Sequence, residues 1–392
     1  MLKIAIVNHY PISGGMSGKD MEMLNISSLL SAPGTKIEAF SISNLSKTTR
    51  TKHIIEHQIS GCVPGKSLGS RLLDISSLLI LSRRPGLEML NDNKQFISAL
   101  RSFSPDLIIS GTFLLSPLMS EYMASCHIKP KLISVFDSQR VIYNYLDSLD
   151  GTLLRSIKPI IKRRYIEYNT SMYSRMLSIS DIVVLHTKKD EMEVAKGFPM
   201  YKGRLRSIPT YFLGDESPQH PKKKIKRILF VGGYAHWPNR EAIDKIEGII
   251  APEMPDKEFI IAGKGTPAGK RGNITCLGTV EDIGAVIRDS DICIAPLISG
   301  SGMKAKILDY FAAGRAVVGT NIAFDGFPVR NGVDAIVEDD LAMFPKRIRA
   351  LERNPALFRS LQKNTATIRR YFSKDRIRRK WLSLVSETLA GP

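Results

Sequence analysis

The sequence predicts an α/β protein made of two Rossmann-like domains, each a doubly wound parallel sheet, that face each other across a cleft. Short apolar runs of strand length, such as residues 3–7, 227–231 and 292–295, alternate with stretches of helical periodicity. Strands that alternate with helices form parallel sheets covered on both faces. The 392 residues are enough for two domains of ordinary size.

Changes in composition predict the domain boundaries. Residues 1–213 form the first domain, and residues 227–370 form the second. Residues 214–226 read as a linker, because a segment rich in Gly, Pro and acids leads into the basic run KKKIKR. Residues 371–392 are expected to form a terminal helix with a basic face.

The first domain opens with a buried strand at residues 3–7, followed by a turn that contains Gly14 and Gly15. This turn lacks the residue spacing of a Walker loop, so by itself it reads as a flexible connection between strand and helix. A second strand follows at 36–41, whereas residues 43–66 show no periodicity and are predicted to be a loop.

Further strands are predicted at 105–110, 131–136 and 181–185, with a long basic helix over residues 152–177. Asp137 directly follows one of these strands, where it could either contact a ligand in the cleft or close a loop.

The second domain is organised around residues 298–327. The strand at 292–295 ends in a turn containing Gly300, Ser301 and Gly302, and a helix is predicted from Met303 to Ala313, followed by Gly314 as its C-cap. A helix N-terminus at the carboxyl end of a parallel strand is a place where α/β sheets bind anions.

The charged residues of this helix are candidate ligand contacts. Lys304 and Lys306 add full positive charges to the helix N-terminus, although the alternative is an ordinary turn with two solvated lysines. Asp309 lies among apolar neighbours, so its carboxylate either bonds a nearby loop or accepts hydrogen bonds from ligand hydroxyls.

The segment KILDYFAAGRAVVGTNIAFDG resembles the nucleotide-sugar site of the GT-B glycosyltransferases, in the retaining group 1 (family 4-like). FVGGYAHWPNREA resembles the start of the C-terminal domain in the same family. The resemblance implies a GT-B fold and transfer of a sugar, with retention, from a nucleoside-diphosphate sugar to a glycan or lipid-linked acceptor. In the family, the terminal helix crosses back to the first domain.

The resemblance also implies roles for individual residues. Catalytic roles fall to Asp137, Lys304 and Lys306. Ser301 occupies the position of a second family acid, Gly233 that of an arginine found in many relatives, and Phe136 that of a histidine. The donor-binding positions implied are Gly14, Gly15, Gly232, Gly233, Gly278, Thr279, Val280, Gly300, Ser301, Gly302, Met303 and Asp309.

Composition limits the other possibilities. The net charge of +18 predicts a polyanionic neighbour, such as an anionic membrane surface, whereas nucleic acid is not favoured because no recognition motif accompanies the charge. No apolar run is long enough to span a membrane, so we expect a cytoplasmic protein, with peripheral attachment to the inner membrane face as an alternative. No cluster of metal-ligand residues is visible, and no metal cofactor is expected.

Two rival functions remain open from the sequence. One is a sugar-nucleotide epimerase on the same fold, and the other is a catalytically degenerate binding module. The residues that depart from the family pattern support the second rival, the binding module.

Overall fold

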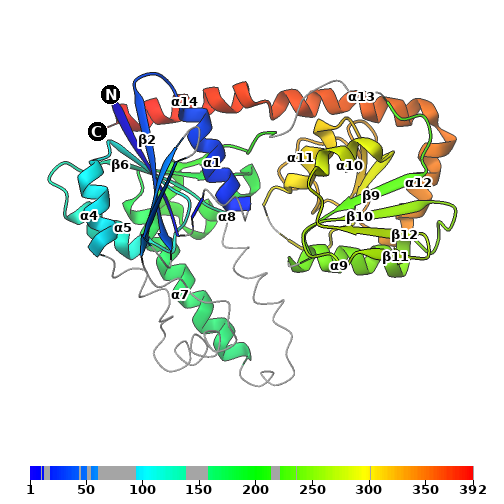
Figure 1. Cartoon of the computed structure of the whole chain (residues 1–392), viewed down its shortest axis with the longest axis horizontal. Coiled ribbons are helices and arrows are strands. Elements are labelled where there is room, and N and C mark those ends of the chain that lie inside the picture. The colour runs from blue at the N-terminus through cyan, green and yellow to red at the C-terminus, as the bar shows by residue number, and fades with distance from the viewer. Residues whose placement is uncertain are drawn as a thin grey trace. The chain divides into compact units, whose positions relative to one another are not determined.

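The computed structural model describes residues 1–9, 11–12, 18–43, 46–50, 54–60, 94–137, 158–212, 221–234, 236–300 and 302–391. The chain divides into two compact units, Met1–Ile208 with Arg378–Pro392, and Pro209–Ile377. Each unit has its own sheet (Figure 1), and each sheet packs against its own hydrophobic core. Gly14, Gly15 and Ser301, which the sequence places in the donor site, lie outside the described residues.

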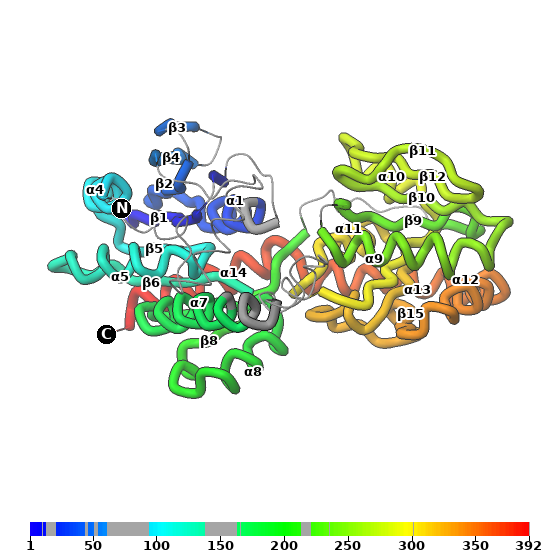
Figure 2. The backbone as a smooth tube through the Cα atoms, turned by 90° about the horizontal axis from the view of Figure 1, so that it is seen from below, coloured from blue at the N-terminus to red at the C-terminus, as the bar shows by residue number. Residues whose placement is uncertain are grey.

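Unit 1 contains an eight-stranded sheet in the order β3-β4-β2-β1-β5-β6-β7-β8, which can be followed in Figure 2. All neighbouring strands are parallel except β3 and β4, which are antiparallel. The strands are β1 (Leu2–Asn8), β2 (Thr35–Ser43), β3 (Lys47–Arg50), β4 (Ile55–Ser60), β5 (Leu107–Ser110), β6 (Lys131–Val135), β7 (Ile182–Leu185) and β8 (Leu205–Ser207).

Helices cover both faces of this sheet. Alternate residues of β1 point to opposite faces, so Ala5 and Val7 pack in the core beneath α4, α5 and α7, while Ile4 and Ile6 are buried on the other side. The helical segments of unit 1 are α1 (Gly18–Leu30), α4 (Lys94–Phe103), α5 (Ser116–Ala124), α7 (Lys158–Ile179), α8 (Lys188–Gly197) and the 3₁₀ segment η2 (Pro199–Arg204).

The prediction of a loop at residues 43–66 is wrong for the part that the structure describes, because β3 and β4 form there. Their side chains do not make an apolar run. Instead β4 pairs with β2 along six residues, and the fully buried Glu56 accepts hydrogen bonds from the Ile12 backbone N (2.7 Å) and Ser41 Oγ (2.8 Å). These long-range bonds compensate the burial of a carboxylate, which local sequence patterns do not reveal.

The C-terminal helix α14 (Lys374–Ala390) packs mostly on unit 1. Arg378 Nε donates a hydrogen bond to the carbonyl oxygen of Leu29 in α1 (2.9 Å), and Arg206 pairs with Glu387 (2.5 Å). Trp381 and Leu384 are buried on the same helix. Among the residues that the structure describes, no helix is both long enough and apolar enough to cross a membrane.

Unit 2 contains a seven-stranded sheet in the order β11-β12-β10-β9-β13-β14-β15. It is parallel except for the edge strand β11, which runs antiparallel to β12. The strands are β9 (Arg227–Val231), β10 (Glu258–Ala262), β11 (Gly269–Arg271), β12 (Ile274–Gly278), β13 (Ile292–Ala295), β14 (Ala316–Gly319) and β15 (Ile336–Val337).

Figure 1 shows α9 on one face of this sheet and α10 and α11 on the other. Right-handed crossovers produce this arrangement, because the chain runs from β9 toward one edge of the sheet and then from β13 toward the other. The helical segments of unit 2 are α9 (Trp237–Lys245) with the π-helical segment η3 (Ile246–Ile250), α10 (Ile283–Asp289), α11 (Ala305–Ala312), η4 (Leu341–Met343), α12 (Phe344–Arg353) and α13 (Pro355–Tyr371).

The side chain of Tyr310 ties α11 to the carboxyl end of β9. Tyr310 is fully buried, and its hydroxyl accepts a hydrogen bond from the Val231 backbone N (2.7 Å).

Tyr310→Phe should lower the free energy of unfolding by about 1–3 kcal/mol, because the partly buried Val231 N–H loses its acceptor. Urea unfolding measures the change, with Tyr201→Phe as a control at a less buried tyrosine; an unchanged midpoint for Tyr310→Phe would show that this bond does not stabilise unit 2.

Candidate active site

The candidate site lies where the strand order of the second sheet reverses. The central strand β9 has β10 on one side and β13 on the other, and both pairings are parallel. Open α/β sheets bind ligands outside the carboxyl ends of strands at such a switch point. The turn with Gly232 and Gly233 follows β9, and the turn at 298–302 follows β13, so both predicted glycine turns lie at the reversal.

Glycine is required in both turns. Gly300 and Gly302 have φ values of +110° and +67°, which side-chain-bearing residues rarely adopt. At Gly232, an added Cβ would lie 2.7 Å from Cγ of Asn239 in α9. The first turn of α9 therefore packs directly against the backbone that leaves β9.

The two lysines of the second turn make different contacts. Lys306 Nζ donates a hydrogen bond to Asn239 Oδ1 (2.6 Å), while Asn239 Nδ2 donates to the carbonyl oxygen of Gly233 (2.9 Å). Lys304 is the N-cap of α11, one residue before the helix begins, and its Nζ donates to the carbonyl oxygen of Gly302 (2.6 Å). Asn239 thus connects the turn after β9 to the lysine of α11.

The electrostatics of this corner favour an anion. Burial, together with the charge of Lys304, lowers the pKa of Lys306 to about 7. The pKa of His236, at the N-cap of α9, is also lowered, by burial and then by Lys306 and Lys304. The N-termini of α9 and α11 add partial positive charge. A bound anion would relieve the repulsion that these groups now experience.

Asp309 provides the carboxylate of α11 and is partly buried. Burial raises its pKa to about 6. Its neighbours Leu308 and Tyr310 are buried, and no hydrogen bond or ion pair reaches its carboxylate from any residue in the described part of the chain. Buried carboxylates normally have partners, so this one is available to accept hydrogen bonds from a ligand.

The other predicted donor residues lie on the turns around this corner. Gly278 ends β12 with φ +70°, and the hydroxyl of Thr279 accepts a hydrogen bond from the Gly265 backbone N (3.4 Å). Val280 and Met303 pack against the hydrophobic core of unit 2. The structure therefore gives these two side chains a packing role, whatever their backbones contact.

Asp137 belongs to unit 1, at the carboxyl end of β6. His186 follows β7 directly, and its Nε2 lies 2.9 Å from Glu22 Oε1 and 3.8 Å from Asp137 Oδ1. The side chain of Asp137 is 39% exposed, compared with 11% for His186, so Asp137 is the member of this group that reaches solvent. The sequence singled out Asp137 but gave no reason to group it with Glu22 and His186, which come from other elements.

Sequence reasoning also missed two polar residues at the switch point of the second sheet. Asn239 links both glycine turns, as described above, and Glu241 accepts a hydrogen bond from Ser299 Oγ (2.5 Å). The Pro-Asn pair at the start of α9 was a signal for Asn239. Nothing in the sequence pairs Glu241 with Ser299, because 58 positions separate them.

Part of the basic charge of the long helix α7 and of the C-terminal helix is already engaged within the chain. In α7, Arg163 and Arg164 both pair with Glu167 (2.8 and 3.3 Å). At the C-terminal helix, Arg376 lies over the ring of Tyr371, 4.5 Å from its centroid.

Comparison with known proteins finds a family match within unit 2 and a partial match to one curated protein. Residues 225–354 match the family "Glycosyl transferases group 1". An uncharacterized 44.6 kDa protein in the cps region of Klebsiella pneumoniae is 24% identical over 254 residues, which cover 58% of this chain and 60% of that protein. The match thus spans less than two thirds of the curated relative.

Solved structures resemble the whole chain at low sequence identity. Sucrose-phosphate synthase from Thermosynechococcus elongatus is 14% identical, with a TM-score of 0.73 and complete coverage of both chains. Anabaena HepE, solved with UDP and glucose, is 12% identical with a TM-score of 0.66, covering 98% of this chain and all of that one. Residues 225–354 therefore match a group 1 glycosyl transferase domain, and the chain shares the two-domain GT-B fold of these solved structures.

Proposed function

We propose that the protein transfers a sugar, with retention, from a nucleoside-diphosphate sugar to a glycan or lipid-linked acceptor. One observation carries the proposal. At the switch point of the second sheet, Lys304, Lys306 and the N-termini of α9 and α11 gather around two glycine turns, and α11 also carries the carboxylate of Asp309, which none of the described residues bonds. These are the groups that a diphosphate and a ribose require.

In this proposal the lysines act on the leaving group. As the bond between sugar and diphosphate breaks, negative charge grows on the diphosphate. The ammonium groups and the backbone N–H groups of the turns, already fixed in place, stabilise that charge. This positive charge lets the reaction proceed without a metal cofactor. Asp309 holds the ribose hydroxyls and takes no part in bond breaking.

In this proposal the configuration at the sugar carbon is retained, because the acceptor attacks from the same face that the diphosphate leaves. The acceptor oxygen forms its bond to the sugar carbon as the bond to diphosphate breaks, and the leaving phosphate oxygen takes the acceptor proton. Asp137, partly exposed in unit 1, is the candidate contact for an acceptor hydroxyl. The likeness to HepE makes UDP-sugars the first donors to test.

The test combines donor screening with an acceptor-dependent assay. A ligand that binds only the folded state raises the melting temperature, so thermal shift with a set of nucleoside-diphosphate sugars identifies the donor. We expect that donor to release nucleoside diphosphate rapidly only when an acceptor is added. Interconversion of free nucleotide sugars would indicate an epimerase, and binding without turnover for every acceptor would indicate a binding module.

A further inference from the structure

A second positively charged feature lies at the opposite end of the same sheet. A recess of about 230 Å³ opens at the amino ends of β9 and β10. Its lining includes Lys223, Lys224 and Lys226, just before β9, together with Lys257, Glu352 and Phe358. The glycine turns follow the carboxyl end of β9, and the five residues of that strand span roughly 16 Å. The recess is therefore separate from the candidate active site.

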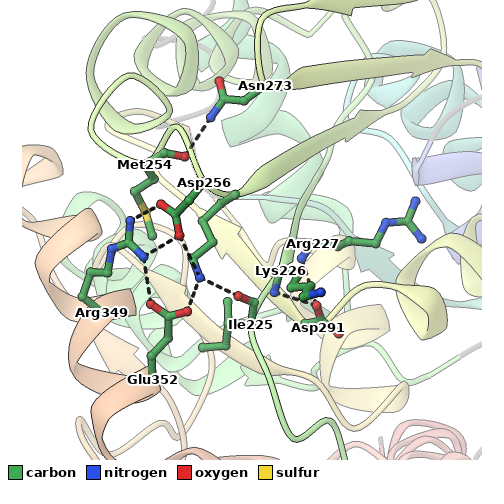
Figure 3. A network of polar contacts seen from close by, with 10 residues as sticks. Ile225, Lys226, Arg227, Met254, Asp256, Asn273, Asp291, Arg349 and Glu352 are labelled. Carbon is green, nitrogen blue, oxygen red and sulfur yellow. Dashed lines mark hydrogen bonds and ion pairs between the residues drawn. The ribbon is translucent and has the colours of Figure 1, made fainter.

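The buried lysine of this recess is already neutralised. Lys257 Nζ donates a hydrogen bond to the carbonyl oxygen of Ile225 (2.8 Å) and pairs with Glu352 and Asp256 (Figure 3). Arg349 pairs with both carboxylates, through bonds of 2.8 Å to Asp256 Oδ2 and 3.1 Å to Glu352 Oε2. Two acids and two bases thus form a closed network of zero net charge.

Three further carboxylates, those of Asp289, Asp291 and Glu258, also have hydrogen-bond or ion-pair partners. Asp291 accepts hydrogen bonds from the backbone N–H groups of residues 226 and 227 (2.8 and 2.9 Å) and lies 3.9 Å from Lys222 Nζ. Arg227 pairs with Asp289 and with Glu258 (3.2 Å). Each of these acids therefore has a basic partner, and none of those partners is a lysine at 223, 224 or 226.

The ammonium groups of three lysines in the recess therefore have no carboxylate partner among the described residues. Lys223, Lys224 and Lys226 are exposed, and within the described residues none of their side chains forms a hydrogen bond or an ion pair. Like charges so close in sequence repel one another. The exposed Pro355, at the first turn of α13, also lines the recess, so a helix N-terminus adds partial positive charge there.

We propose that this recess binds a phosphate group, at a site distinct from the glycine turns. Three lysines that have no partner in the described part of the chain, together with a helix N-terminus, match an anion that carries more than one negative charge. The phosphate can belong to a lipid head group or to a soluble phosphorylated molecule. The recess would then give the chain an anchoring or regulatory site that acts independently of the proposed glycosyl transfer.

The first experiment removes the charge. Lys223, Lys224 and Lys226 are replaced together by Ser in the full chain, and a matched variant replaces the exposed Lys196, Lys202 and Lys270. Pyrophosphate binding is followed by calorimetry, and sedimentation is measured with phosphatidylcholine vesicles with and without phosphatidylglycerol. We expect two pyrophosphate-binding events in the parent and the loss of one, on the order of 100-fold in affinity, in the first variant only.

The second experiment keeps the lysines and fills the site. Pro355→Glu places a carboxylate in the recess at a helix position where acids are favoured, so the protein should fold and bind pyrophosphate there at least tenfold more weakly. Met200→Glu, at an exposed position of unit 1, makes the same change in net charge and should bind as the parent does.

The outcomes separate the sources of the phosphate. If the first triple variant loses one pyrophosphate-binding event and also loses binding to anionic vesicles, the ligand is a lipid head group. If it loses the pyrophosphate-binding event but still binds the vesicles, the ligand is soluble. The proposal is overturned if both pyrophosphate events survive in that variant, if the matched variant loses as much, or if Pro355→Glu binds as the parent does. Loss of vesicle binding alone also overturns it, because the lysines would then attract membranes without forming a site.

Discussion

Asp309→Asn should weaken the binding of a ribonucleoside diphosphate by about 10- to 150-fold and should at the same time stabilise the unliganded protein. The substitution keeps the shape of the side chain but removes the charge that accepts hydrogen bonds from two neighbouring hydroxyls. A 2′,3′-dideoxy analogue lacks those hydroxyls, so its affinity should change little.

The gain in stability follows from the sign of the pKa shift. Burial raises the Asp309 pKa from 3.8 to about 6, so between these values the folded state holds a proton that the unfolded state has released. Stability therefore falls as pH rises through this window, by roughly 3 kcal/mol in all. Asparagine resembles the protonated form at every pH, so Asp309→Asn should be more stable than the parent at pH 7 and equally stable at low pH.

Calorimetry with both ligands and urea unfolding at several pH values measure these effects. Asp244→Asn, at an exposed position of α9, is a control with the same change in charge. Because the Asp309 variant is expected to be more stable, weaker binding cannot be attributed to unfolding. Equal losses for the ribo and dideoxy ligands, or no loss for either, would show that Asp309 does not hold a ribose.

Lys306→Met should weaken nucleoside-diphosphate binding by about 10- to 150-fold, because a charge-assisted hydrogen bond to phosphate is lost. The parent should also take up a proton as it binds. With a pKa of about 7, Lys306 is about half neutral at pH 7, and the bound diphosphate favours its charged form. Diphosphate affinity of the parent should therefore fall as pH rises from 7 to 9.

The stability of the unliganded protein should show the opposite trend. The pKa of Lys306 is lowered from 10.5 to about 7, so between these values the unfolded state binds more protons than the folded state. This residue makes stability rise with pH over that window, and Lys306→Met should remove the dependence.

Calorimetry in buffers with different ionisation enthalpies measures the proton uptake, which should be about half a proton at pH 7 and absent in Lys306→Met. Lys270→Met, at an exposed position, controls for the loss of one positive charge. Lys304→Met tests the second candidate lysine. If neither Lys304→Met nor Lys306→Met weakens binding, the two lysines do not contact the diphosphate and the assignment is wrong.

The sequence by itself determined the strand–glycine–helix units and the fold class. These depend on patterns within a few residues, such as the apolar run at 292–295, the two glycines of the turn that follows, and Gly314, whose φ of +67° is typical of a residue that ends a helix. The predicted helix from Met303 to Ala313 formed as Ala305–Ala312, because Lys304 became the N-cap.

Only the tertiary structure decided which distant residues meet. Lys306 bonds to Asn239 across 67 positions because the reversal of strand order at β9 brings two helix N-termini together. The strands β3 and β4 form without an apolar run because β4 pairs with β2, β3 pairs with β4, and the buried Glu56 accepts hydrogen bonds from distant residues. Hydrogen bonds between distant segments leave no periodic signal in the sequence, since their energy depends on a geometry that exists only after the sheet has formed.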